Sequence, residues 1–239
     1  MLPVSEQKQS IARNISVVRR RIAVAADRVG RPPDAITLMA VSKTQPSEKI
    51  IDCYEAGIRC FGENRVQEFA TKRPQLDLSG ATFTLIGQLQ SNKINKALDL
   101  FSEIHSVDSL RLAERINAAV ERVGKPPMPI AIEINTGDPA KAGLTPELPE
   151  LEQLLQAAER MPHIRIQGLM TIPPFTEDPE RARPYFRRLR ELRDSIAARS
   201  LPGIEMQILS MGMSLDFEIA IEEGSTCVRV GTAIFGERN

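Results

Sequence analysis

The residue of this sequence with the clearest chemical potential is a lysine that follows an apolar run. Lys43 lies in the string Ser42-Lys43-Thr44, directly after the run 35–41. A lysine that is desolvated or close to another cation can lose its proton, and a neutral amine can attack an aldehyde to form a Schiff base. A lysine on an exposed loop would do neither, so Lys43 by itself leaves both interpretations open.

Two loops near the end of the sequence have the composition of an anion site. They are Ser210–Ser214 and Gly231–Gly236. Glycines let backbone N–H groups approach an oxyanion, and the hydroxyls of Ser214 and Thr232 can donate further hydrogen bonds. Structural turns use the same residue types, so neither loop is decisive alone. Together with an amine opposite, they would suit a ligand that carries an aldehyde and a phosphate. Pyridoxal 5′-phosphate is the common biological molecule with both groups.

Short apolar runs alternate with helical stretches along the whole chain. The runs are too short for typical helices and rich in branched residues, as buried strands are; they span 35–41, 58–61, 83–86, 103–107, 129–134, 164–170, 205–209 and 226–230. The clearest helices between them are 110–123, 147–160 and 179–199. Eight alternations predict a parallel sheet, and the length of 239 residues is close to the ~250 of a (β/α)8 TIM barrel. In such barrels the loops after strands seven and eight frequently bind phosphate.

An extra helix precedes the first strand. Apolar residues recur at steps of four and three from Ile11 to Val29, and Gly30 supplies a stop signal. An open doubly wound sheet is the rival fold, but it predicts a G-x-G-x-x-G loop, which the sequence lacks. Because no linker or repeat divides the chain, we expect one domain over residues 1–239.

Composition excludes several classes of protein. Lys plus Arg and Asp plus Glu are 31 each, which gives no case for nucleic acid as a partner. The chain has no signal-peptide pattern and no apolar run near the ~20 residues of a membrane span, so we expect a soluble cytoplasmic protein. Its three cysteines, Cys53, Cys60 and Cys227, form no C-x-x-C pair, which argues against disulfides and a metal site.

Six strings spread in order over the chain resemble the pyridoxal phosphate homeostasis protein family. They are Ala40-Val-Ser-Lys-Thr44, Phe61-Gly-Glu-Asn-Arg-Val-Gln-Glu68, Ile86-Gly-Gln-Leu-Gln-Ser-Asn-Lys93, Gly168-Leu-Met-Thr-Ile-Pro173, Leu209-Ser-Met-Gly-Met-Ser214 and Gly224-Ser-Thr-Cys-Val-Arg-Val-Gly-Thr-Ala-Ile-Phe-Gly236. The resemblance implies a monomeric barrel, similar to the N-terminal domain of alanine racemase, that holds pyridoxal 5′-phosphate as a Schiff base.

The resemblance also assigns roles to single residues. Lys43 would carry the Schiff base, Arg229 would face the pyridine nitrogen or the phosphate, and Asn64 would line the ring. The phosphate would be surrounded by Ser210, Ser214, Gly231 and Thr232. Lys141 corresponds to a family lysine thought to affect transfer of the cofactor or its secondary binding.

The sequence departs from the family pattern at two places. Thr84 stands where members commonly have a histidine, which puts any proton transfer or ring contact there in doubt. The loop 135–141, which carries Lys141, is one residue shorter than the usual family form and contains Pro139.

A carrier of the cofactor is favoured over an enzyme, with no catalytic residues. Racemisation needs acid–base groups on both faces of a carbanion. The second base of alanine racemase-like enzymes comes from another domain, and the chain ends at Asn239, soon after the last loop glycine. Tyr54 and Tyr185 fall in predicted helices, and His105 is only a possible neighbour of the site. An arginine facing the ring nitrogen would disfavour its protonation and weaken carbanion chemistry.

Three hypotheses therefore stand side by side. The favoured one is a protein of intracellular vitamin B6 homeostasis that holds pyridoxal 5′-phosphate and passes it to apo-enzymes. The first alternative is a pyridoxal-phosphate-dependent amino-acid racemase, and the second is a Schiff-base aldolase acting on a sugar phosphate. Colour, borohydride trapping on Lys43 and hydrogen exchange at an amino-acid α-carbon would distinguish them.

Overall fold

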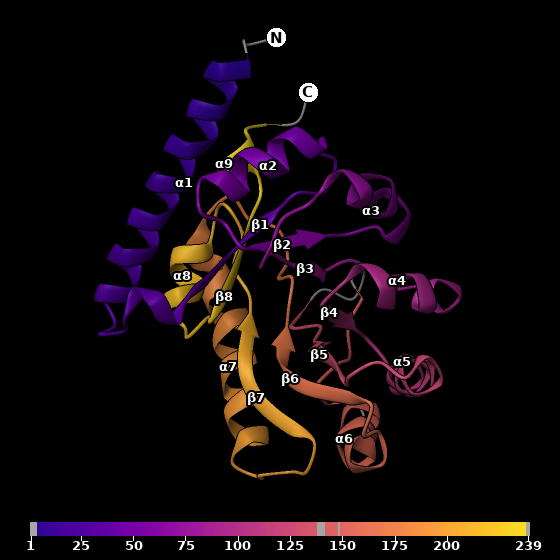
Figure 1. Ribbon diagram of the computed structural model, residues 1–239. Helices are drawn as coiled ribbons and strands as arrows, with labels where there is room; N and C mark the ends of the chain where they lie inside the picture. Colours follow the sequence, from indigo (N-terminus) through magenta and orange to yellow (C-terminus); the bar gives the residue numbers. More distant parts are fainter. Residues whose placement is uncertain (1–3, 138–141, 148, 238–239) are drawn as a thin grey trace.

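Eight parallel strands close into a barrel in the computed structural model, which describes residues 4–137, 142–147 and 149–237 (Figure 1). Each strand pairs with the next along the chain, and β1 closes the barrel by pairing with β8. The strands are β1 (Thr37–Val41), β2 (Cys60–Glu63), β3 (Thr82–Leu85), β4 (Glu103–Val107), β5 (Met128–Glu133), β6 (Ile164–Met170), β7 (Ile204–Ser210) and β8 (Cys227–Val230).

Every predicted apolar run overlaps one of these strands, so the predicted TIM barrel with an extra N-terminal helix is confirmed. The predicted run 58–61 differs most from its strand, since β2 spans Cys60–Glu63. Ile58 is buried, but it lies in the turn after the preceding helix, where its amide donates to Cys53 O. Gly62 and Glu63 belong to β2 instead, because their backbone pairs with Thr84 and Leu85 of β3.

Helices surround the barrel in the order that the sequence predicts. They are α1 (Val4–Asp27), α2 (Ser47–Glu55), α3 (Val66–Lys72), α4 (Ile94–Leu100), α5 (Leu110–Val123), α6 (Pro149–Ala157), α7 (Arg183–Ala197), α8 (Phe217–Glu222) and α9 (Thr232–Phe235). The predicted helix 179–199 begins as a 3-10 turn over Pro179–Ala182, and α7 follows with Pro184 in its first turn. Proline lacks an N–H group, so the first turn of an α-helix is where it is tolerated. In the part of the chain that the structure describes, no helix has the length and apolar character to span a bilayer.

The extra helix α1 lies along the outside of the barrel, beside α2, α8 and α9 (Figure 1). Its buried stripe contains Ile11, Ile15, Val18 and Ile22, as the spacing predicts. Asn14 Nδ2 donates to Ile234 O of α9 at 2.9 Å. α1 therefore packs where the first and last parts of the barrel meet.

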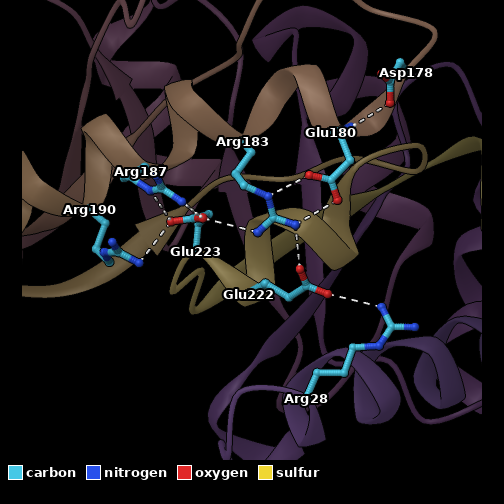
Figure 2. A network of polar contacts seen from close by, with 8 residues as sticks. All are labelled: Arg28, Asp178, Glu180, Arg183, Arg187, Arg190, Glu222 and Glu223. Carbon is cyan, nitrogen blue, oxygen red and sulfur yellow. Dashed lines mark hydrogen bonds and ion pairs between the residues drawn. The ribbon is translucent and has the colours of Figure 1, made fainter.

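A network of ion pairs joins α7 to α8 and reaches α1 (Figure 2). The Glu223 carboxylate, 4% exposed, lies within 3.0–3.2 Å of nitrogens of Arg183, Arg187 and Arg190. Glu222 bridges Arg183 and Arg28 at 2.7 and 3.1 Å. Burial alone would raise the pKa of Glu223, but hydrogen bonds from Arg187 and Arg183 hold that pKa below its usual value.

Replacing Glu223 by Gln should therefore destabilise the protein at neutral pH. The arginines lose a shared counter-ion, and we expect a loss of about 1–3 kcal/mol in the free energy of unfolding, measured by urea denaturation. Since the folded-state pKa of Glu223 is lowered, its contribution is complete above the unfolded value of about 4.3 and is lost as the pH falls below it. The difference in the free energy of unfolding between Glu223→Gln and the wild type should therefore shrink as the pH falls below about 4.3.

Glu152→Gln is the matched control, because Glu152 forms an ion pair with Arg199 in which both side chains are well exposed, 45% and 38%. Exposed pairs contribute about 0–1 kcal/mol. Equal destabilisation by the two substitutions would contradict the role given to Glu223.

Candidate functional site

A pocket lies at the carboxyl ends of the strands, where barrel proteins place their chemistry. Its wall combines the ends of β1, β2, β3 and β8 with the loops after β6 and β7. It is formed by Val41, Lys43, Gln45, Asn64, Ile86, Ile172, Pro174, Phe175, Thr176, Met213, Ser214, Leu215, Asp216, Arg229, Gly231, Thr232, Phe235 and Gly236. Six of the seven site residues predicted from the sequence are among them, and Ser210 is the exception.

Lys43 enters this wall from the end of β1. Barrel pairing continues one residue beyond the strand, since the Ser42 amide donates to Gly62 O at 3.0 Å. Lys43 is half-buried, and Thr44 after it has a left-handed backbone with φ 64°. The chain thus turns away from the barrel immediately after Lys43 and leaves the lysine at the rim.

The hydroxyl of Ser214 joins the two predicted phosphate loops. Its Oγ accepts hydrogen bonds from the amides of Gly231 at 3.3 Å and Ala233 at 3.2 Å. The loop that carries Ser214 is itself fixed, because Asp216 Oδ1 accepts from the Met213 amide at 2.6 Å. A hydroxyl that accepts two amides can still donate its own proton, so this corner of the pocket offers donors to an anion.

Arg229 supplies a buried cation to the same wall. Its side chain is 3% exposed, and Nη2 donates to Thr171 O at 2.7 Å while Nη1 donates to Ser210 Oγ at 2.9 Å and to Ser210 O. Burial lowers the pKa of Arg229, and the nearby carboxylates of Glu133 and Asp216 oppose that effect. Carbonyl groups at the ends of β6 and β7 therefore fix the plane of the guanidinium.

Ser210 lies behind Arg229 and is fully buried, so its hydroxyl contacts the guanidinium instead of the pocket. Sequence reasoning missed Asp216, which accepts a hydrogen bond from the Met213 amide and so fixes the loop. The signal that could have identified it is an aspartate three residues after Met213. Sequence reasoning also missed the apolar mouth of the pocket, where Phe175 is 78% and Leu215 58% exposed.

The side-chain oxygen Oδ1 of Asn64 is a buried hydrogen-bond acceptor. The residue is half-buried in the pocket wall, and its Oδ1 has no hydrogen-bond partner among the described residues. A buried acceptor without a partner is costly, and a bound donor would relieve that cost.

Two other residues noted in the sequence, Thr84 and His105, lie apart from the pocket wall. Thr84 is buried at β3 and reaches Glu103 Oε2 at 3.5 Å, while His105 Nε2 lies 3.1 Å from the same oxygen. Lys141 and Pro139 lie outside the described residues. Within the described ranges, no group of three or more His, Cys, Asp or Glu side chains could hold a metal ion.

Glu133, at the end of β5, is a buried acid close to the cation. Burial raises its pKa to about 7, the charge of Asp108 adds to the shift, and Arg229 opposes it. The electrostatic field on Arg229 therefore changes near neutral pH.

Comparison with known proteins adds three findings. Residues 8–239 match the family model of the alanine racemase N-terminal domain. The chain is 42% identical to proteins named pyridoxal phosphate homeostasis protein from Aquifex aeolicus, over 94% of this chain and 96% of that one, and from Escherichia coli, over 96% and 97%. It also superposes with a TM-score of 0.83 on PipY of Synechococcus elongatus with PLP bound, at 35% identity over 95% of this chain and 100% of that one.

Gly212, in the loop before Ser214, should be intolerant of a side chain. Its φ is 93°, and an added Cβ would lie 2.6 Å from Ala220 Cβ and 2.9 Å from Phe217 Cα. We expect Gly212→Ala to lower the free energy of unfolding by about 2–4 kcal/mol, from backbone strain and overpacking together.

Gly30→Ala is the control, because Gly30 also has a positive φ of 65° but no atom within 4 Å of the added Cβ. It should cost only about 1 kcal/mol. Similar losses in urea denaturation would show that close packing at Gly212 is unimportant.

Proposed function

Because the chain belongs to the pyridoxal phosphate homeostasis protein family, with the barrel of the alanine racemase N-terminal domain, we propose that it binds pyridoxal 5′-phosphate and holds it as a Schiff base on Lys43. The observation that carries this proposal is a single pocket whose wall contains Lys43, Ser214, Gly231 and Arg229. The bound PLP in the solved structure of PipY supports the same choice of ligand.

The residues of the wall suit the two ends of this ligand. When bound, the cofactor supplies an aldehyde that an amine captures reversibly and a phosphate that needs hydrogen-bond donors. The amine of Lys43, once deprotonated, would form the C=N bond, and the aldehyde oxygen would leave as water. Ser214, Gly231 and Thr232 would bind the phosphate through hydroxyl and amide groups. Ser210 would act on the site through Arg229, whose guanidinium it holds.

Asn64 and Arg229 would bind the part of the ligand between those ends. The unpartnered Oδ1 of Asn64 would gain a donor from the ring substituents. The guanidinium of Arg229 would disfavour a second positive charge on the ring nitrogen, and a neutral ring withdraws electrons weakly. The contact with Arg229 therefore favours holding the ligand over activating it.

We infer a carrier without efficient turnover. In the part of the chain that the structure describes, the ionisable side chains of the pocket wall are Lys43, Asp216 and Arg229. Racemisation needs acid–base groups on both faces of a carbanion. The hydroxyl of Tyr54 donates to Ser79 O instead, and His105 is buried beside Glu103, so neither belongs to the wall.

The cellular role that this chemistry supports is the storage and delivery of a reactive aldehyde. A reversible covalent bond keeps the free concentration of the aldehyde low and still allows release to apo-enzymes that depend on pyridoxal phosphate. We propose that the protein acts in this way in the cytoplasm, as a monomer that takes part in vitamin B6 homeostasis.

Lys43→Ala should abolish the covalent adduct and leave the fold intact, because a half-buried lysine at a strand end contributes little packing. The wild-type protein with bound cofactor should be yellow, and borohydride should remove the visible band and fix the ligand on Lys43, as peptide mapping would reveal. Lys96→Ala, on the exposed side of α4, is the control and should behave as wild type.

A reducible adduct that persists in Lys43→Ala would assign the Schiff base to another residue. Rapid exchange of an amino-acid α-proton for solvent deuterium by the wild-type protein would replace the carrier by the racemase alternative.

A further inference from the structure

The two peptide groups that flank Lys43 are held by neighbouring side chains of α3. Lys72 Nζ donates to Ser42 O at 3.1 Å, and Glu68 Oε1 accepts from the Thr44 amide at 2.6 Å. These two side chains are also paired with each other, with Lys72 Nζ 2.6 Å from Glu68 Oε1. The carbonyl before Lys43 and the amide after it are thus bound by one ion-paired unit.

A buried carboxylate fixes this unit to the barrel. Glu63, the last residue of β2, is 0% exposed, and its Oε1 accepts from Lys72 Nζ at 3.2 Å and from Ser42 Oγ at 2.8 Å. Burial raises the pKa of Glu63, while the charge of Lys72 and the hydroxyl of Ser42 oppose that shift. Since the Lys72 side chain is only 11% exposed, the contacts lie in a region where ion pairs are strong and unpaired charges are costly.

Thr44 explains why the backbone needs such support. Its φ of 64° is unfavourable for a residue with a branched side chain. The hydrogen bond from its amide to Glu68 stabilises this conformation. Without that bond, Thr44 would relax toward an ordinary backbone conformation and would rotate the lysine next to it.

We propose that Glu68 and Lys72 are positioning residues for Lys43: they clamp its backbone from both sides and keep its amine in the pocket wall. This inference rests on the proposed Schiff base. Neither residue belongs to the pocket wall, so each acts through the Ser42–Thr44 backbone and not on the ligand.

The clamp should affect bond formation and not the binding of the anion. Reactions between bound groups are sensitive to geometry, and a displacement of about 1 Å can cost about 100-fold in rate. The proposed donors for the phosphate come from the loops after β7 and β8, and Ser214 Oγ accepts from the Gly231 and Ala233 amides, not from α3. Loss of the clamp should therefore slow covalent capture and leave the non-covalent affinity for the ligand unchanged.

The test compares two ligands in variants of Glu68. Pyridoxal 5′-phosphate reports covalent capture through the rate of the visible absorbance change and borohydride trapping on Lys43. Pyridoxamine 5′-phosphate has the same ring and phosphate but no aldehyde, so it reports non-covalent binding alone. We expect Glu68→Ala to slow capture about tenfold or more and to change the Kd of pyridoxamine 5′-phosphate by less than about twofold.

Rescue by a conservative variant distinguishes positioning from general stability. Glu68→Gln keeps a side-chain oxygen that can accept from the Thr44 amide, and it should recover most of the capture rate. Glu55→Ala removes an exposed carboxylate that pairs with Lys8 on the outer helices, and it should capture the aldehyde as wild type does. The double variant Glu63→Gln/Lys72→Met removes the buried pair together, so that no buried charge is left alone, and should slow capture as Glu68→Ala does.

Two results would overturn the clamp. One is an unchanged capture rate in Glu68→Ala, and the other is a parallel loss of capture and of pyridoxamine 5′-phosphate affinity, which would indicate a general loss of structure. A wild-type protein that forms no reducible adduct would instead refute the proposed role of Lys43 itself, and this outcome is visible before any variant is made.

Discussion

The hydrogen-bonded closure of the barrel between β1 and β8 is the constraint on which the site depends. Thr37 to Ala40 pair in register with Cys227 to Val230. Because the two strands are parallel, Lys43 and Gly231 emerge at the same rim although they lie near opposite ends of the sequence. Lys43 and the loop residues Gly231 and Thr232 can line one pocket only while this pairing holds.

Several charges are buried in the barrel, and groups of neighbouring strands and of α3 contact them. Carbonyl oxygens at Ser210 and Thr171 hold Arg229, and Ser42 and Lys72 hold Glu63. Glu133 is compensated less well, which is why burial raises its pKa to about 7. Below that pH its carboxyl group is neutral, so the positive potential of Arg229 is less opposed. The electrostatic potential at Arg229 therefore depends on the protonation of Glu133, a residue outside the pocket wall.

The fold was predictable from the sequence because its pattern is repetitive. Eight apolar runs end in polar or glycine residues, and the barrel puts those endings at one rim. The lysine and the two loops could be recognised for the same reason. The error at Ile58 has a physical origin, since an apolar side chain is buried equally well in a turn under a helix and in a strand.

The finer arrangement of the site could not be predicted in this way. Strand side chains alternate in direction, and the sequence does not reveal whether Ser210 would face the ligand or support Arg229 from behind. The pair Glu68 and Lys72 has the i,i+4 spacing of an ordinary surface ion pair. Only the hydrogen bonds of these side chains to the backbone that follows β1 distinguish the pair from the solvated pairs of this chain.

The contact between α1 and α9 connects the outer helix to an element that lines the pocket. α9 is short, with Thr232 and Phe235 in the pocket wall on one side and Ile234 O bound by Asn14 of α1 on the other. The four residues of α9, Thr232–Phe235, thus contact α1 on one side and line the pocket on the other. If a ligand in the pocket favours docking of α1 by some factor, docking of α1 must strengthen the binding of that ligand by the same factor.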